Sequence, residues 1–222
     1  MISGTEFMEK YCNDCGSQRC EGIGTMWFAG CPHRDELLPE IAEGNESMKK
    51  KYKLGMYLGR FQPFHNGHKA IVDKMLEECE EVLIVVGSAD KMGTMQNPFP
   101  AWERINMIGM VYRDKPVHIV ALPDRPTITQ DNRWGVYVME FLEGMNFEPD
   151  VIYQGMETER NTWFEYYPTI PVVSVSRLII PISATIIRAA IVEKDTVFMY
   201  ENCPEEVYTY IYNSMYWGKN FK

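Results

Sequence analysis

The chain has 222 residues, of which 45% are hydrophobic and 24% charged, and its formal net charge at pH 7 is −9. This apolar fraction excludes a disordered chain, and the length allows one full domain with a small appendage. The acidic balance argues against general nucleic-acid binding, which needs a basic face, but leaves nucleotides open as ligands. No apolar run approaches the roughly 20 residues of a bilayer crossing and no signal pattern opens the chain, so we expect a cytoplasmic protein without a membrane partner.

Four of the six cysteines fall within the first 31 residues, at Cys12, Cys15, Cys20 and Cys31. In a chain without an export signal, such bunching indicates metal binding rather than disulfides. Structural zinc on these four thiols, with His33 as an alternative ligand, is one hypothesis. A docked arm without metal and an iron–sulfur cluster are the two alternatives.

The composition divides the chain into a Cys-rich extension at 1–36, a linker at 37–52 and a regular domain at 53–222. Residues 1–7 read MISGTEF, in which Gly-Thr-Glu-Phe can be encoded by two adjoining cloning sites, and we give these seven residues no functional weight.

In the regular domain, short runs rich in β-branched residues alternate with longer amphipathic ones. Strands are predicted at Leu54–Leu58, Val82–Val86, Val117–Leu122, Val151–Tyr153 and Val172–Val175. Helices are predicted at Gly67–Cys79, Ala101–Tyr112, Trp134–Met145, Glu159–Tyr166, Ala184–Glu193 and Pro204–Trp217. This alternation predicts an α/β fold with a doubly wound parallel sheet, which binds ligands beyond the carboxyl ends of its strands.

Residues 59–68, GRFQPFHNGH, directly follow the first predicted strand. Gly59 lets a ligand approach the backbone closely, and the helix that follows offers free N–H groups to an anion. His65 and His68 are three residues apart and therefore project on one side of that helix start. Together with Arg60 they predict a phosphate-binding site, against the alternative of a turn with two surface histidines.

This decamer resembles the HxGH signature of the nucleotidyltransferase superfamily, and its flanks resemble the archaeal-type nicotinamide-mononucleotide (NMN) adenylyltransferases. Further segments at predicted strand ends resemble that family's motifs in order: Gly87-Ser88-Ala89, Asn97-Pro98-Phe99, Glu103-Arg104, Asp124, Asn132-Arg133-Trp134, Tyr153-Gln154-Gly155 and Ser183 to Arg188. The resemblance covers about residues 53–217. Family residues are replaced at Trp102, Met156 and Ala184.

The resemblance implies a Rossmann-like domain that transfers AMP from ATP to the 5′-phosphate of NMN, giving NAD⁺ and pyrophosphate. It implies catalytic roles for His65, His68 and Arg188. It implies ATP contacts from Gly59, Arg60, Phe61, His65, His68, Gly87, Ser88, Gly155, Ser183, Thr185 and Arg188. It implies NMN contacts from Arg104, Asp124, Asn132 and Trp134, with the indole stacked on the nicotinamide ring. Mg²⁺ is expected to arrive with ATP, and a homo-oligomer is allowed because family members are often multimers.

Other interpretations stay open at this point. Ser183 to Arg188 also fits an ordinary helix cap with a solvated arginine, and Trp134 also fits a core aromatic. The same chemistry can serve phosphopantetheine, FMN or another acceptor, and a non-catalytic nucleotide sensor is the rival of a different class. Trp134 favours NMN because a pantetheine arm has no ring for an indole to stack on.

Overall fold

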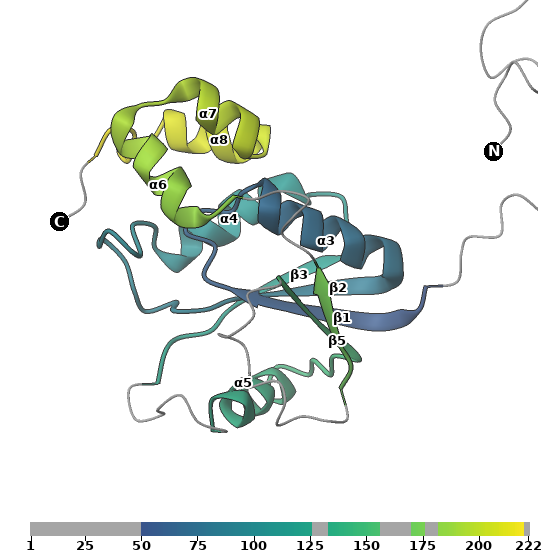
Figure 1. The fold of residues 1–222 in the computed structure, drawn as a ribbon. Coiled ribbons are helices and arrows are strands. Elements are labelled where there is room, and N and C mark those ends of the chain that lie inside the picture. Colours follow the sequence, from purple (N-terminus) through teal and green to yellow (C-terminus); the bar gives the residue numbers. More distant parts are fainter. Residues whose placement is uncertain (1–49, 126–132, 156–169, 176–181, 220–222) are drawn as a thin grey trace, which may run out of the picture. The chain divides into compact units, whose positions relative to one another are not determined.

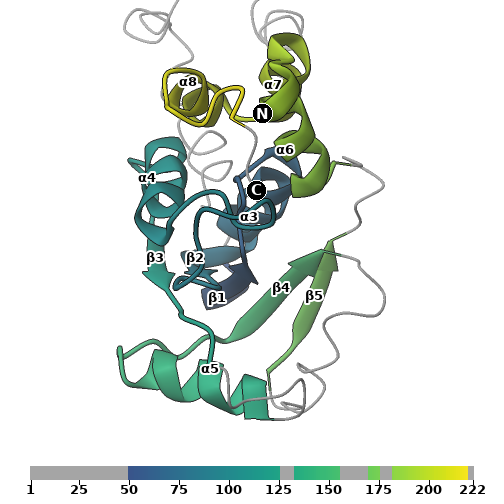
Figure 2. The same cartoon turned by 90° about the vertical axis from the view of Figure 1, so that its left-hand side faces the viewer.

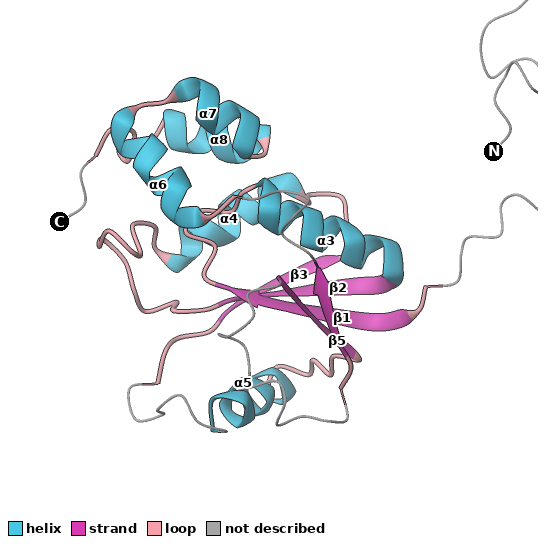
Figure 3. Cartoon of the chain, viewed as in Figure 1, coloured by secondary structure: helices cyan, strands magenta, loops and turns pink. Residues whose placement is uncertain are grey.

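The fold is a parallel sheet with helices on both faces (Figures 1 and 3). The computed structural model describes residues 50–125, 133–155, 170–175 and 182–219. Within these ranges the strands are β1 (Tyr52–Gly59), β2 (Cys79–Val86), β3 (Val117–Ala121), β4 (Val151–Gly155) and β5 (Val172–Val175). Their order is β3-β2-β1-β4-β5 and every pairing is parallel, which confirms the predicted doubly wound sheet.

The strand order reverses beside β1, which lies between β2 and β4. Gly59 at the end of β1 is in register with Val86 of β2, and Tyr57 is in register with Tyr153 of β4. The carboxyl ends of β1 and β4 therefore border the point where ligands of such sheets bind.

The helices lie in two layers (Figure 2). They are α3 (Asn66–Glu78), α4 (Ala101–Val111), α5 (Arg133–Glu143), α6 (Ala184–Glu193), α7 (Thr196–Asn202) and α8 (Glu205–Tyr212). Figure 1 shows α3 and α4 on one face of the sheet, with α6, α7 and α8 beyond them, and α5 on the other face. None of the helices in the described ranges has the length and apolar composition to cross a membrane.

Alternating strand residues form a separate core on each face of the sheet. On the α5 face, Leu54 and Met56 of β1 pack with Leu83 and Val85 of β2. On the α3 and α4 face, the larger cluster also contains residues of α6, α7 and α8. Burial on both faces explains why these strands are near-continuous apolar runs in the sequence.

The predicted C-terminal helices differ from the structure in one region. The predicted helix Pro204–Trp217 is shorter and forms α8, while α7 was not predicted. The helix α6 ends at Lys194, which adopts a left-handed φ of 59°, and the Asp195 carboxylate then caps α7 by accepting from the Phe198 N–H at 3.0 Å. The predicted helix Glu159–Tyr166 lies outside the described residues.

Gly55 in the middle of β1 is a tight packing position. A Cβ on Gly55 would lie 2.6 Å from Cys79 Sγ and 3.3 Å from both Met75 Cε and Tyr153 Cε2. We expect Gly55→Ala to lower the free energy of unfolding of the full chain by about 1–3 kcal/mol, because the overpacked core must shift. Urea denaturation measures this loss.

The control for this prediction is Gly109→Ala in α4. Its added Cβ meets only Ile119 Cδ1, at an ordinary 3.9 Å. Alanine favours the helix over glycine by about 1 kcal/mol, so this variant should be as stable as the parent or more stable. Equal stability of the two variants would contradict the packing argument.

Candidate active site

The turn between β1 and α3 forms one wall of the candidate site. Phe61 adopts a left-handed φ of 50° and its ring is buried. That ring lies beneath Gly59, where an added Cβ would come within 2.9 Å of Phe61 Cζ. The glycine predicted to admit a ligand is therefore also required by the folding of its own turn.

The two histidines of the turn are stacked on each other. The His65 and His68 ring centroids are 3.8 Å apart, with 25° between the ring planes. His65 is only 4% exposed, and its Nδ1 accepts the Gly67 N–H at 3.1 Å as the N-cap of α3. A neutral His65 therefore has its proton on Nε2. Two imidazoles this close favour a nearby anion whenever either one is protonated.

Gly67 keeps these rings in place. An added Cβ would lie 3.0 Å from His65 Cε1 and 3.0 Å from Ile182 Cγ2. The glycine between the two histidines thus gives space to the His65 ring and to the segment that leads into α6. This explains the residue type at that position without any ligand.

Arg188 of α6 lies beside the same turn. The residue is 8% exposed, and its guanidinium donates to the Gln62 carbonyl at 3.0 Å and to Thr185 Oγ1 at 3.1 Å. Burial, followed by repulsion from the Arg60 charge, lowers the pKa of Arg188. Two guanidinium groups that repel each other beside a helix N-terminus form an electropositive site suited to an anion.

Gln62 connects this turn to the segment that precedes α4. Its side chain is 1% exposed, donates to the Phe99 carbonyl at 2.8 Å and accepts from the Phe99 N–H at 2.9 Å. Its carbonyl is the acceptor for Arg188. Gln62 was not among the predicted site residues, and its one signal in the sequence is a polar residue amid Phe61, Pro63 and Phe64.

Arg104 lies under the site rather than on its surface. The residue is 0% exposed, and Nη1 donates to the Arg60 and Gly87 carbonyls, each at 2.7 Å. Nη2 donates to the Ser88 carbonyl at 3.0 Å. The predicted contact between Arg104 and the NMN phosphate stays a prediction, and it now has to be weighed against these three bonds to the protein's own backbone.

The loops after β2 and β3 are joined to each other. Ser88, predicted to contact ATP, donates from Oγ to Oδ1 of Asp124, predicted to contact NMN, at 3.2 Å. The Asp124 N–H donates to Asp90 Oδ1 at 2.8 Å, and Asp90 forms an ion pair with Lys91. The two predicted subsites thus meet at the Ser88–Asp124 hydrogen bond.

Trp134 lies in the first turn of α5, at the same edge of the sheet. It is half-buried and packs against the core on the α5 face, with its ring centroid 5.4 Å from that of Tyr137. The Tyr137 hydroxyl donates to the Pro123 carbonyl at 2.9 Å, which ties α5 to the loop after β3. Trp134 therefore has a packing role beside its predicted ligand role.

The structure describes only some of the remaining predicted site residues. Gly155 ends β4, and Ser183 is the N-cap residue of α6 without a side-chain cap bond. Asn132 lies outside the described residues, as do the predicted metal ligands Cys12, Cys15, Cys20, Cys31 and His33. Within the described ranges, no group of three His, Cys, Asp or Glu side chains could hold a metal ion.

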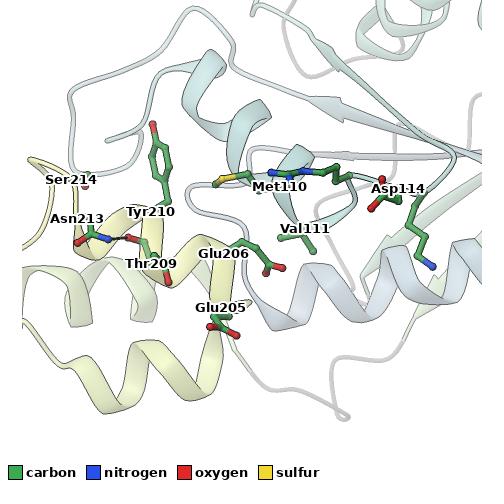
Figure 4. A pocket seen from close by; sticks show the side chains of 11 residues that line it. Met110, Val111, Asp114, Glu205, Glu206, Thr209, Tyr210, Asn213 and Ser214 are labelled. Atoms are coloured by element: carbon green, nitrogen blue, oxygen red, sulfur yellow. Dashed lines mark hydrogen bonds between the residues drawn. The ribbon is translucent and has the colours of Figure 1, made fainter.

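A groove of about 1040 Å³ lies between α8 and the C-terminal end of α4 (Figure 4). Charged residues of both signs border it: Arg113, Asp114 and Lys115 after α4, and Glu205 and Glu206 of α8. None of the predicted site residues lines it. Because α4 runs back from the carboxyl edge of the sheet, this groove lies at the far end of α4 from the histidines.

Several known proteins resemble this chain in sequence. The nicotinamide-nucleotide adenylyltransferase of Thermococcus sibiricus is 34% identical over 162 residues, covering 71% of this chain and 82% of the relative. The nicotinamide-nucleotide adenylyltransferase of Methanocorpusculum labreanum is 46% identical over 72 residues, which cover 32% of this chain and 43% of the relative. This chain spans about half the length of several of the curated relatives it matches.

Among solved structures, a bifunctional NMN adenylyltransferase/ADP ribose pyrophosphatase from Francisella tularensis matches with a TM-score of 0.56 and 19% identity. That match covers 75% of this chain and 51% of the other. The model of the cytidylyltransferase-like family matches residues 56–190, from the middle of β1 into α6. These matched residues include the stacked histidines and Arg188, and the chain belongs to the cytidylyltransferase-like family.

Proposed function

We propose that this protein transfers the AMP moiety of ATP to the 5′-phosphate of NMN, forming NAD⁺ and pyrophosphate. The observation on which this rests is the cluster at the end of β1, where His65 and His68 stack at the N-terminus of α3 beside Arg188. The relatives of 34–46% identity that are named nicotinamide-nucleotide adenylyltransferase support NMN as the acceptor.

In the proposed reaction an oxygen of the NMN phosphate attacks the α-phosphorus of ATP. The bond from that phosphorus to the α,β-bridging oxygen breaks, and pyrophosphate leaves. The attacking phosphate is already an anion, so no protein nucleophile is needed. The protein's contribution is to align the two substrates and to stabilise charge on the transferring group.

The histidines and the arginines around the end of β1 have different roles in the proposed reaction. His65 and His68 donate to the phosphate oxygens, with His68 nearest the α-phosphorus. Arg60, which is exposed, and Arg188 neutralise the triphosphate and then the departing pyrophosphate. Guanidinium groups suit this task because their planar donors match phosphate oxygens in pairs.

Magnesium is proposed to enter with ATP as part of the substrate. Mg²⁺ keeps several waters and binds mainly through substrate phosphate oxygens, so it needs no dedicated cage of carboxylates. A homo-oligomer and a zinc site in residues 1–36 stay predictions.

The acceptor is proposed to bind beyond the carboxyl end of β3, beside Asp124 and the first turn of α5. Trp134 lies at the first turn of α5, where its exposed part can stack on a pyridinium ring. Asp124 and Asn132 are the proposed partners of the carboxamide or ribose. A phosphopantetheine arm has no ring for the indole to stack on, whereas nicotinic acid mononucleotide has the same pyridinium ring as NMN.

Replacing Trp134 tests this acceptor site. We expect Trp134→Ala to raise the KM for NMN about tenfold, the loss of a cation–π contact, and to leave the KM for ATP nearly unchanged. Trp134→Phe, which retains a ring, should recover part of the loss. Tyr200→Ala on α7, where Tyr200 is exposed, is the control and should change neither constant. An effect on ATP alone would misplace the acceptor site.

The function itself is tested by a product assay with the full chain. Protein, Mg²⁺ and ATP are offered NMN, nicotinic acid mononucleotide, FMN or 4′-phosphopantetheine in parallel, and pyrophosphate and dinucleotide are measured. NAD⁺ formed from NMN supports the proposal. Turnover with phosphopantetheine or FMN alone would retain the reaction class and remove the acceptor assignment. Nucleotide binding without turnover of any acceptor would favour a sensor.

A further inference from the structure

Arg104 combines complete burial with bonds to three main-chain carbonyls. It projects from the first turn of α4 and reaches beneath the ends of both β1 and β2. Its acceptors, the carbonyls of Arg60, Gly87 and Ser88, belong to three residues that the resemblance implies as ATP contacts. One side chain therefore joins the two loops from which the proposed nucleotide site is built.

This arrangement is costly for stability alone. An ionised guanidinium taken out of water is usually compensated by a carboxylate. Among the described residues, no carboxylate lies within ion-pair distance of Arg104. Burial, with added repulsion from Arg60, lowers the pKa of Arg104 to about 10, while Asp124 and Asp90 act in the opposite direction. The group stays charged at neutral pH, so a buried cation is maintained beneath the site.

The bonds also control where the neighbouring amides point. In a trans peptide the N–H is directed opposite to the preceding C=O. Carbonyls of Arg60 and Gly87 that point to Arg104 consequently turn the N–H groups of Phe61 and Ser88 away from it. Phe61 and Ser88 both adopt left-handed φ angles, 50° and 47°, which cost free energy in non-glycine residues. The guanidinium holds the peptides beside these residues in that arrangement.

We propose that Arg104 is a positioning residue for the nucleotide site. Its guanidinium locks the loops after β1 and β2 so that their backbone donors and Arg60 are ready for the phosphates of ATP. This inference rests on the proposed function for the identity of the ligand, but the locking of the loops can be measured without any turnover. It replaces the role of NMN-phosphate ligand that the resemblance implied for Arg104.

The experiment compares Arg104→Lys with the parent. Lysine keeps the charge, but a single ammonium cannot span the three carbonyls that the guanidinium reaches. Two readouts are taken: hydrogen exchange of the Gly87 amide, which donates to the Gly59 carbonyl at 2.9 Å, and the Kd of MgATP from calorimetry. We expect at least about tenfold faster exchange at Gly87 and about tenfold weaker MgATP binding, the loss of roughly one charge-assisted hydrogen bond.

Two further variants make the outcome decisive. Arg113→Lys, an exposed arginine after α4, is the matched control and should leave both readouts unchanged. Arg104→Gln lacks the charge and keeps an amide donor, and it serves as the second test if the lysine variant is poorly folded. Both Arg104 variants should lose loop protection while amides in the middle of β2 keep theirs.

Three results would overturn the inference. Parent-like exchange and MgATP affinity in Arg104→Lys would show that charge alone suffices. A raised KM for NMN with unchanged exchange and MgATP affinity would return Arg104 to the role of acceptor ligand. Loss of protection throughout β2 would make Arg104 a general stability residue. If the parent forms no NAD⁺, the proposed function fails, whereas exchange at Gly87 still decides the role of Arg104.

Discussion

Replacing His68 with alanine is expected to lower kcat for NAD⁺ formation by about 10³-fold while the Kd of MgATP rises by less than about tenfold, because the lost contact strengthens in the transition state. His68 is held on four sides by rings, including those of Phe61, Phe64 and His65. Such a preorganised imidazole needs no reorientation when negative charge develops on the transferring group. Steady-state kinetics and calorimetric titration with MgATP measure the two quantities.

The control for this prediction is His118→Ala. His118 lies on β3, is half-buried and pairs with Glu81 at 2.6 Å, so its loss should leave both constants as in the parent. Equal losses in kcat and in MgATP affinity for His68→Ala would make His68 a ground-state ligand only. A loss of similar size in His118→Ala would point to an effect on the fold.

His65 needs a different substitution, because its ring also caps α3. Alanine at this position would remove both the Nδ1 acceptor for the Gly67 N–H and any phosphate contact. Loss of a helix cap alone costs about 1 kcal/mol of stability, which would obscure the kinetic result. Asparagine keeps a capping oxygen, so His65→Asn separates the two roles.

The sheet was predictable from the sequence because its strands are buried on both faces. In β2 the run Val82–Val86 is apolar at every position, and in the structure each of these side chains is fully buried. The helix α7 was missed for the opposite reason. It is short, and its start depends on the Asp195 cap and the left-handed Lys194 rather than on a long apolar period.

The predicted site was recoverable where the motif itself determines the geometry. Histidines three residues apart at a helix start lie on one side of it, and in the structure their rings stack. Arg104 shows where such reasoning ends. An arginine near a strand end looks the same in sequence whether it faces a phosphate or three carbonyls, and only the complete burial of its side chain distinguishes the two.

Gln62 illustrates the same limit from another side. Its side chain forms hydrogen bonds with the main chain of Phe99, 37 residues away, and its own main-chain carbonyl accepts a hydrogen bond from Arg188. No periodicity or local spacing encodes either contact. The side-chain roles that a sequence can predict are therefore those set by one turn or one helix, and the bridges between loops require the fold.

Replacing Arg188 should separate activity from stability most clearly. We expect Arg188→Met to lower kcat/KM by about 10³-fold, the scale of an arginine that stabilises transferring phosphoryl charge. The reverse reaction, NAD⁺ with pyrophosphate, should show a raised KM for pyrophosphate, since the same group faces the leaving group in both directions. Arg188→Lys keeps the charge without the planar pair of donors and should fall between the parent and the methionine variant.

The same Arg188→Met substitution is expected to change the free energy of unfolding of the ligand-free protein by no more than about 1 kcal/mol, because replacing a buried charge by an apolar side chain of similar length is often neutral. Burial and the Arg60 charge both disfavour the ionised guanidinium, and methionine removes both costs while it gives up the bonds to Gln62 and Thr185. Arg113→Met, at an exposed position, should change neither activity nor stability. A large loss of stability in Arg188→Met would mean that this arginine is retained to hold α6 on the turn. Preserved stability with lost turnover would mean that the buried Arg188 charge acts on the phosphates and is not needed for the fold.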